Sequence, residues 1–395
     1  KQPGSKKQPK AATPRKIRVQ TRLIASLSVL VLSALLLTVV LFLVPPPPQS
    51  PSGSSSAAST ARDYEETILG ELETTVETID RIVQRTAQNH NVPIHPQHVE
   101  TRTKAGQRYH YQELALAGDG YATGVTQALA DALQSHDQIQ LQFAAKGTWE
   151  ISTFGVITHR LSFSPSPQPS ENQQGLLCIV IDDLGEDLHK AKQLAQFKFP
   201  ITFSVLPSST HTRDIVDLAR KHGLELLLHQ PMEPKSYPET DPGPGALFMD
   251  MNAAAIQNTL RKNLAQIPDA VGINNHMGSR FTASVKGMRS TFQKLAKRQL
   301  FFLDSLTSPD SVARRIAHQA HIPYLRRNIF LDNVQDREAI VYQLHKAERM
   351  ALSRGTAIAI GHPYEATLQA IAQWQSERDH RVRLTPLSTL LTQHS

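Results

Sequence analysis

Residues 175–185 read GLLCIVIDDLG, and six apolar residues, Leu176 to Ile181, lead directly into the carboxylates of Asp182 and Asp183. A short continuous run of aliphatic and β-branched residues indicates a strand that is buried on both faces, as in a parallel sheet or barrel. Charged aspartates at the end of such a strand are costly unless they have a partner. One interpretation is a metal bound by one carboxylate, with the other acting as a base. The alternative is a cap for the next helix.

The net charge of +7 comes from the start of the chain. Residues 1–22 hold eight lysines and arginines and no acidic residue, so the remainder is close to neutral. We therefore expect no nucleic-acid partner. The single cysteine, Cys178, lies inside the apolar run. It excludes an intrachain disulfide or a cysteine-based zinc site and predicts a buried core thiol.

Residues 23–44 carry no charge and are long enough to cross a bilayer as a helix. Basic residues precede this stretch and none follow it closely, which predicts a cytoplasmic tail at 1–22 and a single-pass anchor. We expect a bacterial inner-membrane protein whose C-terminal domains lie in the periplasm. A cleaved signal peptide is the competing interpretation, although the apolar run is longer than a usual signal core.

The segment between this stretch and Gly175 predicts two linkers and a small domain. Residues 45–62 are rich in proline and serine, and 164–174 contain three prolines without an apolar run. Between them, residues 63–163 predict a small α+β accessory domain without recognisable chemistry. Its role is positioning or contact with a protein partner that the sequence does not identify. The predicted helices are 64–88 and 123–133, and the predicted strands are 109–116, 139–144 and 149–161.

From Gly175 to the end, strand and helix patterns alternate. This alternation predicts a deformed (β/α) barrel of seven or eight repeats over residues 175–395. An open doubly wound sheet is the second choice, although no glycine-rich phosphate loop follows the first strand. The predicted strands are 176–182, 201–206, 224–229, 271–275, 300–304, 324–331, 357–361 and 382–384. The predicted helices are 188–196, 214–222, 252–266, 285–298, 311–319, 337–353 and 364–375.

Five of these strands end in residues that can bind a metal or transfer protons. In a parallel barrel such strand ends share one pocket. Oxygen and nitrogen ligands of this kind suit zinc or a similar divalent metal. The residues are Asp182, Asp183, His229, Asn275, His276, Asp304 and His362. Glu233, four residues after His229, is a further candidate oxygen ligand, but the prolines around it argue against a helix there.

The stretches IDDLG, HQPMEP, NNHMGS, FFLDS and AIGHP, in this order, resemble the divergent polysaccharide deacetylase family of envelope proteins over about residues 175–391. The resemblance implies a deformed barrel and metal-dependent removal of acetyl groups from a glycan such as peptidoglycan or an exported polysaccharide. Carried over by position, it implies Asp182 as general base, Asp183 and His229 as metal ligands, His362 as general acid, and Asp304 as the carboxylate that orients His362.

The chain departs from the pattern of related deacetylases at two places. Glu233 stands where those proteins have a second histidine, and Asn275 and His276, with Arg280 nearby, stand where they have an arginine-proline motif. The third ligand is therefore His276 or Glu233. We assign Asn275 and Arg280 to substrate binding.

Two other functions compete with a membrane-anchored zinc deacetylase. A catalytically silent envelope protein that binds a glycan or a protein would account for the altered ligand set and the extra domain. Another metal-dependent hydrolase, such as an amidase or phosphoesterase, would use the same strand ends. Loss of metal binding favours the first of these two, and a substrate panel distinguishes the second.

Overall fold

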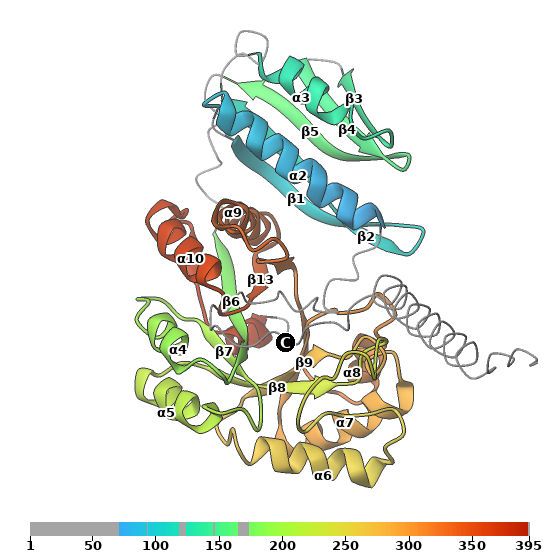
Figure 1. The fold of residues 1–395 in the computed structure, drawn as a ribbon, viewed down its shortest axis with the longest axis vertical. Coiled ribbons are helices and arrows are strands. Elements are labelled where there is room, and N and C mark those ends of the chain that lie inside the picture. The colour runs from blue at the N-terminus through green and yellow to red at the C-terminus, as the bar shows by residue number, and fades with distance from the viewer. Residues whose placement is uncertain (1–70, 93, 118–123, 145–146, 165–173, 394–395) are drawn as a thin grey trace, which may run out of the picture. The chain divides into compact units, whose positions relative to one another are not determined.

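The computed structural model describes residues 71–92, 94–117, 124–144, 147–164 and 174–393 (Figure 1). The predicted tail at 1–22, the predicted anchor at 23–44 and the linker at 45–62 lie outside the described residues. Within the described ranges, no helix combines the length and the apolar character that a membrane span requires.

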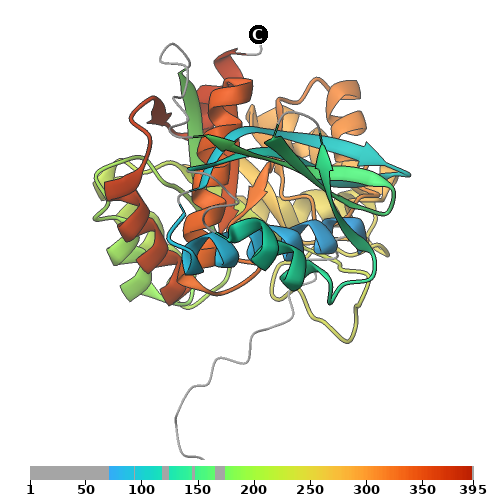
Figure 2. The same cartoon turned by 90° about the horizontal axis from the view of Figure 1, so that it is seen from above.

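The N-terminal part is a five-stranded sheet with two helices on one face (Figure 2). Its strands occur in the order β1-β2-β5-β4-β3, and β2 and β5 are parallel. The apolar sides of α2 and α3 pack on the sheet through residues such as Ile79, Val83 and Leu129. The elements are α2 (Glu71–Asn89), β1 (Ile94–Lys104), β2 (Gln107–Ala117), α3 (Val125–Leu133), β3 (Ile139–Ala144), β4 (Thr148–Thr153) and β5 (Val156–Ser164).

Two predictions for this part were wrong. Strand β1 was not predicted, because Ile94–Lys104 contains mostly polar residues and its strand state depends on pairing with β2. The predicted single strand 149–161 is a hairpin of β4 and β5. Its turn is made by Phe154 and Gly155, which both have positive φ, and such residues allow a tight connection between twisted strands.

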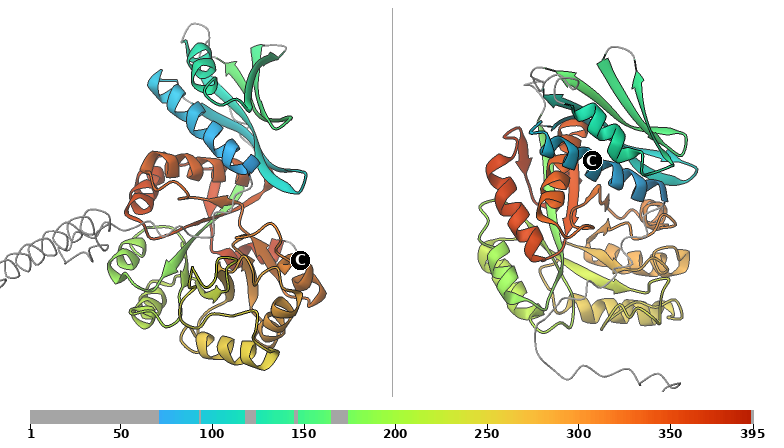
Figure 3. Two further views of the ribbon diagram at one scale, coloured as in Figure 1. Left: turned by 45° about the vertical axis from the view of Figure 1, so that its right-hand side comes forward. Right: turned by 45° about the horizontal axis from the view of Figure 1, so that its top comes forward.

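The C-terminal part is a nine-stranded sheet whose strands are parallel. The order is β11-β10-β9-β8-β7-β6-β13-β12, and β14 also pairs with β6. Helices surround the strands on the outside (Figure 3). The strands are β6 (Gly175–Leu184), β7 (Thr202–Val205), β8 (Leu226–Met232), β9 (Gly272–Met277), β10 (Phe301–Asp304), β11 (Tyr324–Arg326), β12 (Ile329–Phe330), β13 (Thr356–Gly361) and β14 (Val382–Leu384). The helices are α4 (Leu188–Leu194), α5 (Thr212–His222), α6 (Ala253–Leu264), α7 (Val285–Arg298), α8 (Ala313–Gln319), α9 (Arg337–Arg354), α10 (Glu365–Glu377) and the 3-10 helix η3 (Leu387–Gln393).

The ladder of this sheet is interrupted at one place, so the predicted barrel is confirmed as a half-barrel of parallel strands. The predicted strand 324–331 is divided into β11 and β12, which are the two edge strands and are separated by Arg327 and Asn328 alone. Side chains span the interruption. Arg327 Nε donates to the carbonyl of Ser305 at 2.7 Å, and Asn328 Oδ1 accepts from the amide of Ile358 at 2.8 Å.

Alternate residues of the strands form two separate cores. Leu177, Ile179 and Ile181 belong to the outer core under the helices, while Cys178 and Val180 belong to an inner core made by strands and η3. A doubly wound sheet would have helices on both faces, which these clusters do not show. The two-sided burial of β6 and the buried thiol of Cys178 are confirmed.

A buried polar network joins α2 and the N-terminal sheet to α9, and both sheets belong to one compact unit. Asp80 on α2 accepts from Lys346 Nζ at 2.7 Å and lies 2.6 Å from His159 Nε2. Gln112 also donates to Asp80 and accepts from the hydroxyl of Tyr342 at 3.2 Å. Burial raises the pKa of Asp80, but Lys346 and His159 outweigh burial and hold the pKa below its ordinary value. Whether 63–163 and 175–395 are separate domains stays a prediction.

Glu77, one turn before Asp80, makes the stability of this junction depend on pH. Its carboxylate accepts from Asn333 Nδ2 at 2.9 Å, and burial raises its pKa from 4.5 to about 7. The folded protein therefore binds more protons than the unfolded chain between those values, and its stability falls as the pH rises from 4.5 to about 7. Glu77→Gln keeps the acceptor for Asn333 without the charge. We expect it to raise the melting temperature at pH 8 more than at pH 5.

The matched control for Glu77 is Glu71→Gln, because Glu71 lies exposed on the same helix. Thermal unfolding of both variants at the two pH values measures the effect. A Glu77→Gln shift of equal size at pH 5 and pH 8 would contradict the assignment.

Candidate metal centre and acid–base residues

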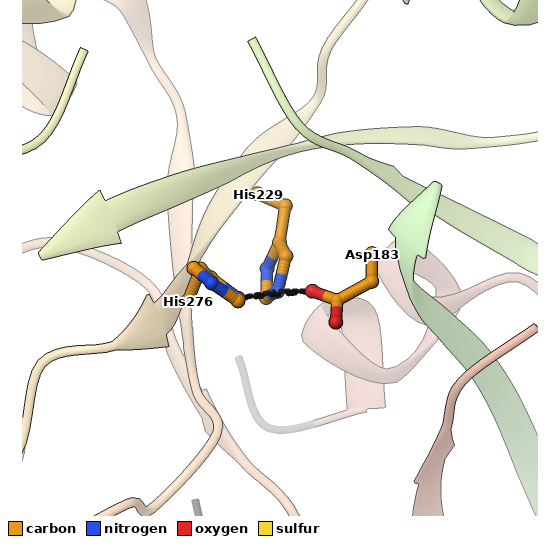
Figure 4. A group of neighbouring side chains, drawn as sticks. All are labelled: Asp183, His229 and His276. Atoms are coloured by element: carbon orange, nitrogen blue, oxygen red, sulfur yellow. Dashed lines mark hydrogen bonds and ion pairs between the residues drawn. The ribbon is translucent and has the colours of Figure 1, made fainter. Parts of the chain in front are cut away.

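Three side chains from three strands converge at the C-terminal ends of the parallel sheet (Figure 4). Asp183 follows the apolar run of β6, His229 lies in β8, and His276 lies in β9. Asp183 Oδ1 is 3.0 Å from His229 Nε2 and 2.9 Å from His276 Nδ1. The two ring nitrogens are 3.2 Å apart. The structure thus brings together two predicted ligands and one of the two alternatives for the third.

A bulge at the end of β6 gives the two aspartates different positions. Asp182 continues the inward side of Val180, and its side chain is fully buried. Asp183 would point outward by strand alternation. However, its φ of 56° lies in the left-handed region and the register with β7 shifts between Ile181 and Leu184, which redirects its side chain. Such a conformation is uncommon for a residue other than glycine and is often found at functional sites.

His229 and His276 belong to the inward-pointing sets of their strands. His229 has the same parity as Leu227, which lies in the inner core, and β8 pairs with β9 in parallel register. The chain leaves β9 at Gly278, whose φ is 88° and whose position leaves no room for a side chain, because a Cβ atom there would lie 2.7 Å from Cβ of Met232. Glycine at this place lets β9 end close against β8, which keeps His276 beside His229.

The chemistry of the cluster fits a divalent metal. Ligand atoms bound tetrahedrally to zinc at 2.0–2.2 Å lie roughly 3.4 Å apart, close to the spacing of the three atoms. Asp183 Oδ1 is buried, and no hydrogen bond among the described residues satisfies it. Burial raises the pKa of Asp183, but His276 and His229 outweigh burial and hold the pKa well below its usual range. An ionised carboxylate beside two imidazole nitrogens is a suitable ligand set.

Asp182 lies next to this cluster. Its Oδ1 is 3.9 Å from His229 Nδ1, and both of its carboxylate oxygens accept from Asn274 Nδ2, at 2.8 and 3.0 Å. It is the carboxylate that the resemblance assigns as general base.

His362 follows β13 and pairs with a carboxylate that we did not predict. His362 Nδ1 is 3.0 Å from Asp332 Oδ1, and Asp332 Oδ2 accepts from the His362 amide at 2.6 Å and from Thr367 Oγ1 at 2.7 Å. The ring of His362 packs against Phe330, and its charge also lowers the pKa of Asp183, so it lies near the cluster. With Nδ1 directed at Asp332, Nε2 is the atom of His362 that can act toward the site.

The prediction that Asp304 orients His362 was wrong. Asp304 has the parity of Phe302, which lies in the outer core, so its side chain points toward the helices. There it accepts from Ser311 Oγ at 2.8 Å and from the hydroxyl of Tyr324 at 2.9 Å. Its role in the structure is to hold the chain that follows β10.

Three other predicted site residues lie outside the cluster. Glu233 accepts from Arg280 Nη1 at 2.8 Å and from the amide of Met249 at 2.6 Å, so it is not the third ligand. Arg280 is half exposed in this ion pair, and its role in substrate binding stays a prediction. Asn275 alternates outward and donates to the carbonyl of Met277 at 2.8 Å, which contradicts its placement toward substrate.

The sequence contained signals for the two residues that we missed. Asp332 directly follows the apolar residues Ile329 to Leu331, as the other candidates follow their strands. Asn274 is two residues before His276 and therefore shares its side of β9, whereas Asn275 does not.

A parallel α/β half-barrel with a ligand cluster and an acid–base pair at its strand ends defines a class of hydrolase-like proteins. The model of the divergent polysaccharide deacetylases matches residues 179–391, and the chain belongs to this family, as the resemblance predicted. The match begins within β6, so it does not include the N-terminal sheet.

Relatives of this half-barrel occur in several bacteria. The uncharacterized protein YibQ of Escherichia coli K12 is 36% identical over 219 residues, which are 55% of this chain and 68% of YibQ. An uncharacterized protein of Haemophilus influenzae is 36% identical over 200 residues, or 50% of this chain and 70% of that protein. The crystal structure of an uncharacterized protein from Agrobacterium tumefaciens C58 matches with 28% identity and a TM-score of 0.53, covering 57% of this chain and 92% of that one.

Proposed function

We propose that the protein is a metal-dependent deacetylase that acts on an acetylated carbohydrate, with peptidoglycan or an exported polysaccharide as its substrate. The observation that carries the proposal is the convergence of Asp183, His229 and His276 within 4.8 Å of one another. Membership of the divergent polysaccharide deacetylase family supports the substrate class. Zinc is the metal we propose, because one carboxylate and two imidazoles suit it.

The residues around the cluster have separate tasks in this proposal. A bound divalent ion polarises the acetyl carbonyl and lowers the pKa of water. Asp182 accepts the proton of the attacking water. His362, held through Nδ1 by Asp332, donates a proton to the leaving amine or alkoxide of the sugar. The half-barrel keeps Asp182 and His362 buried and thus protects both from bulk water.

We further propose that residues 23–44 anchor the protein in a bacterial inner membrane and that the half-barrel acts in the periplasm. The uncharged apolar stretch and the basic residues before it support this location. A glycan of the cell envelope would be within reach of such an enzyme.

Metal content tests the proposal directly. We expect about one zinc per chain in the purified protein by mass spectrometry, and a loss of most of it in Asp183→Ala and in His229→Ala. His211→Ala is the matched control, because His211 pairs with Asp214 in an exposed position. Metal binding with acetate release from acetylated oligosaccharides would support the full proposal.

Two outcomes would contradict this proposed function. Protein that contains no metal when zinc is supplied would overturn the ligand assignment. Metal binding without acetate release from any acetylated glycan would favour the catalytically silent binding protein, and release of phosphate or an amine from other substrates would favour a different hydrolase.

A further inference from the structure

Asn274 lies at the centre of the site and contacts two of its functional groups at once. Its side chain is fully buried on the inward side of β9. Asn274 Oδ1 is 3.0 Å from His229 Nδ1 and accepts from Ser204 Oγ at 2.7 Å. Its Nδ2 donates to both carboxylate oxygens of Asp182 and lies 3.2 Å from Ser305 Oγ. One amide therefore connects the candidate ligand on β8 with the candidate base on β6.

The neighbours of Asn274 determine which end of its amide is oxygen. If the amide were rotated by 180°, its oxygen would lie about 3 Å from both oxygens of Asp182, and three acceptors would meet without a proton between them. In the observed orientation, each oxygen of Asp182 receives an N–H. The position of the hydrogen-bond acceptor next to His229 follows from this requirement.

This orientation also determines the tautomer of His229. Since Asn274 Oδ1 can only accept, His229 Nδ1 must carry the hydrogen of the neutral imidazole. The lone pair then lies on Nε2, the atom that is 3.0 Å from Asp183 Oδ1. A histidine bound to a metal through one nitrogen commonly donates from the other nitrogen to a fixed acceptor, which orients the ring.

We propose that Asn274 is the positioning residue that prepares His229 to bind a metal through Nε2 and holds Asp182 as a proton acceptor beside it. Ser204, from β7, completes the arrangement by fixing the acceptor oxygen of Asn274. The metal part of this inference rests on the proposed function. The tautomer of His229 does not, because the hydrogen bonds already define it in the protein without metal.

Two substitutions at position 274 separate the two tasks of the amide. Asn274→Ala removes the acceptor for His229 and the donor to Asp182, and we expect zinc affinity to fall roughly 10- to 100-fold. Asn274→Asp keeps an acceptor oxygen for His229, so we expect most of the affinity to remain. It also places a second carboxyl group against Asp182, which either repels that carboxylate or shares a proton with it, and in both cases acetate release falls.

The experiment measures two quantities that do not depend on turnover. Competition with a chromogenic chelator gives zinc affinity, and ¹⁵N NMR of histidine-labelled protein without metal, at pH 8, gives the tautomer of His229. We expect the Nδ1–H tautomer in the unsubstituted protein and in Asn274→Asp, and a mixture of tautomers in Asn274→Ala. Ser204→Ala should change both quantities in the same direction by a smaller amount. Asn275→Ala is the control, because its side chain lies on the other side of β9.

The outcomes distinguish this inference from the proposed function. An Nε2–H tautomer in the unsubstituted protein, or unchanged tautomer and affinity in a folded Asn274→Ala, would overturn the role of Asn274. An equal loss of affinity in Asn274→Asp and Asn274→Ala would also overturn it. If the unsubstituted protein binds no zinc but shows the expected tautomer, the proposed function fails while the positioning of His229 by Asn274 stands.

Discussion

Asp80→Ala is expected to lower the free energy of unfolding by about 3–5 kcal/mol, because it leaves the ammonium group of Lys346 buried without its carboxylate. Both side chains of this pair are only 2% exposed, and their charged atoms are 2.7 Å apart. His159 and Gln112 lose the same partner. Denaturant unfolding of the purified protein measures the change. The double variant Asp80→Ala with Lys346→Met should recover most of the loss, since it removes both buried charges.

The exposed pair of Lys235 and Asp310 is the matched control. It has the same residue types and a similar separation of 2.8 Å, but its side chains are 48% and 62% exposed. Asp310→Ala should therefore cost at most about 1 kcal/mol. A loss in Asp80→Ala no larger than in Asp310→Ala would show that the buried network does not stabilise the junction of α2 with α9.

Asp332→Asn is expected to lower the turnover number for acetate release by about 10²- to 10⁴-fold, the range lost when a general acid is disabled. The amide cannot accept all three hydrogen bonds that Asp332 receives from the ring and the backbone of His362 and from Thr367. The imidazole then loses the acceptor that fixes its orientation and stabilises its protonated form. His362→Ala should have an effect of the same size, and KM should change little in both.

Asp304→Asn distinguishes the structure from the family resemblance. The resemblance assigns Asp304 to His362, whereas the structure places its side chain against Ser311 and Tyr324 on the outer side of β10. We therefore expect turnover in Asp304→Asn to stay near that of the unsubstituted protein once both are compared at a temperature where they are folded. A larger loss of turnover in Asp304→Asn than in Asp332→Asn would contradict the assignment of Asp332.

Much of the architecture could be predicted because local pattern decides it. The uninterrupted apolar run at the start of the half-barrel can only be a strand buried on two sides, and it lies in both cores. Most of the predicted strands and helices after Gly175 agree with the observed elements to within a few residues. The stretch 324–331 is the exception. Its residues are extended throughout, and only the curvature of the sheet separates them into β11 and β12 on opposite edges.

Pairing also decided the N-terminal sheet more than composition did. Strand β1 is polar over most of its length and becomes a strand because β2 provides its hydrogen bonds. The buried ion pair of Asp80 and Lys346 joins residues 266 positions apart, and neither local sequence marks its residue as buried. Long-range partners of this kind lie beyond any reading of a single segment.

The sequence by itself determined the order of strands and helices, the family, and the residue types that gather at the strand ends. Only the tertiary structure decided which of those residues share a pocket. Strand alternation turns Asn275 and Asp304 away from it, while the left-handed backbone of Asp183 turns that carboxylate inward. The physical reason is that a side chain's direction depends on bulges, register and the closure of the sheet. Those features arise from contacts between strands, and for this reason Asp332 rather than Asp304 holds His362.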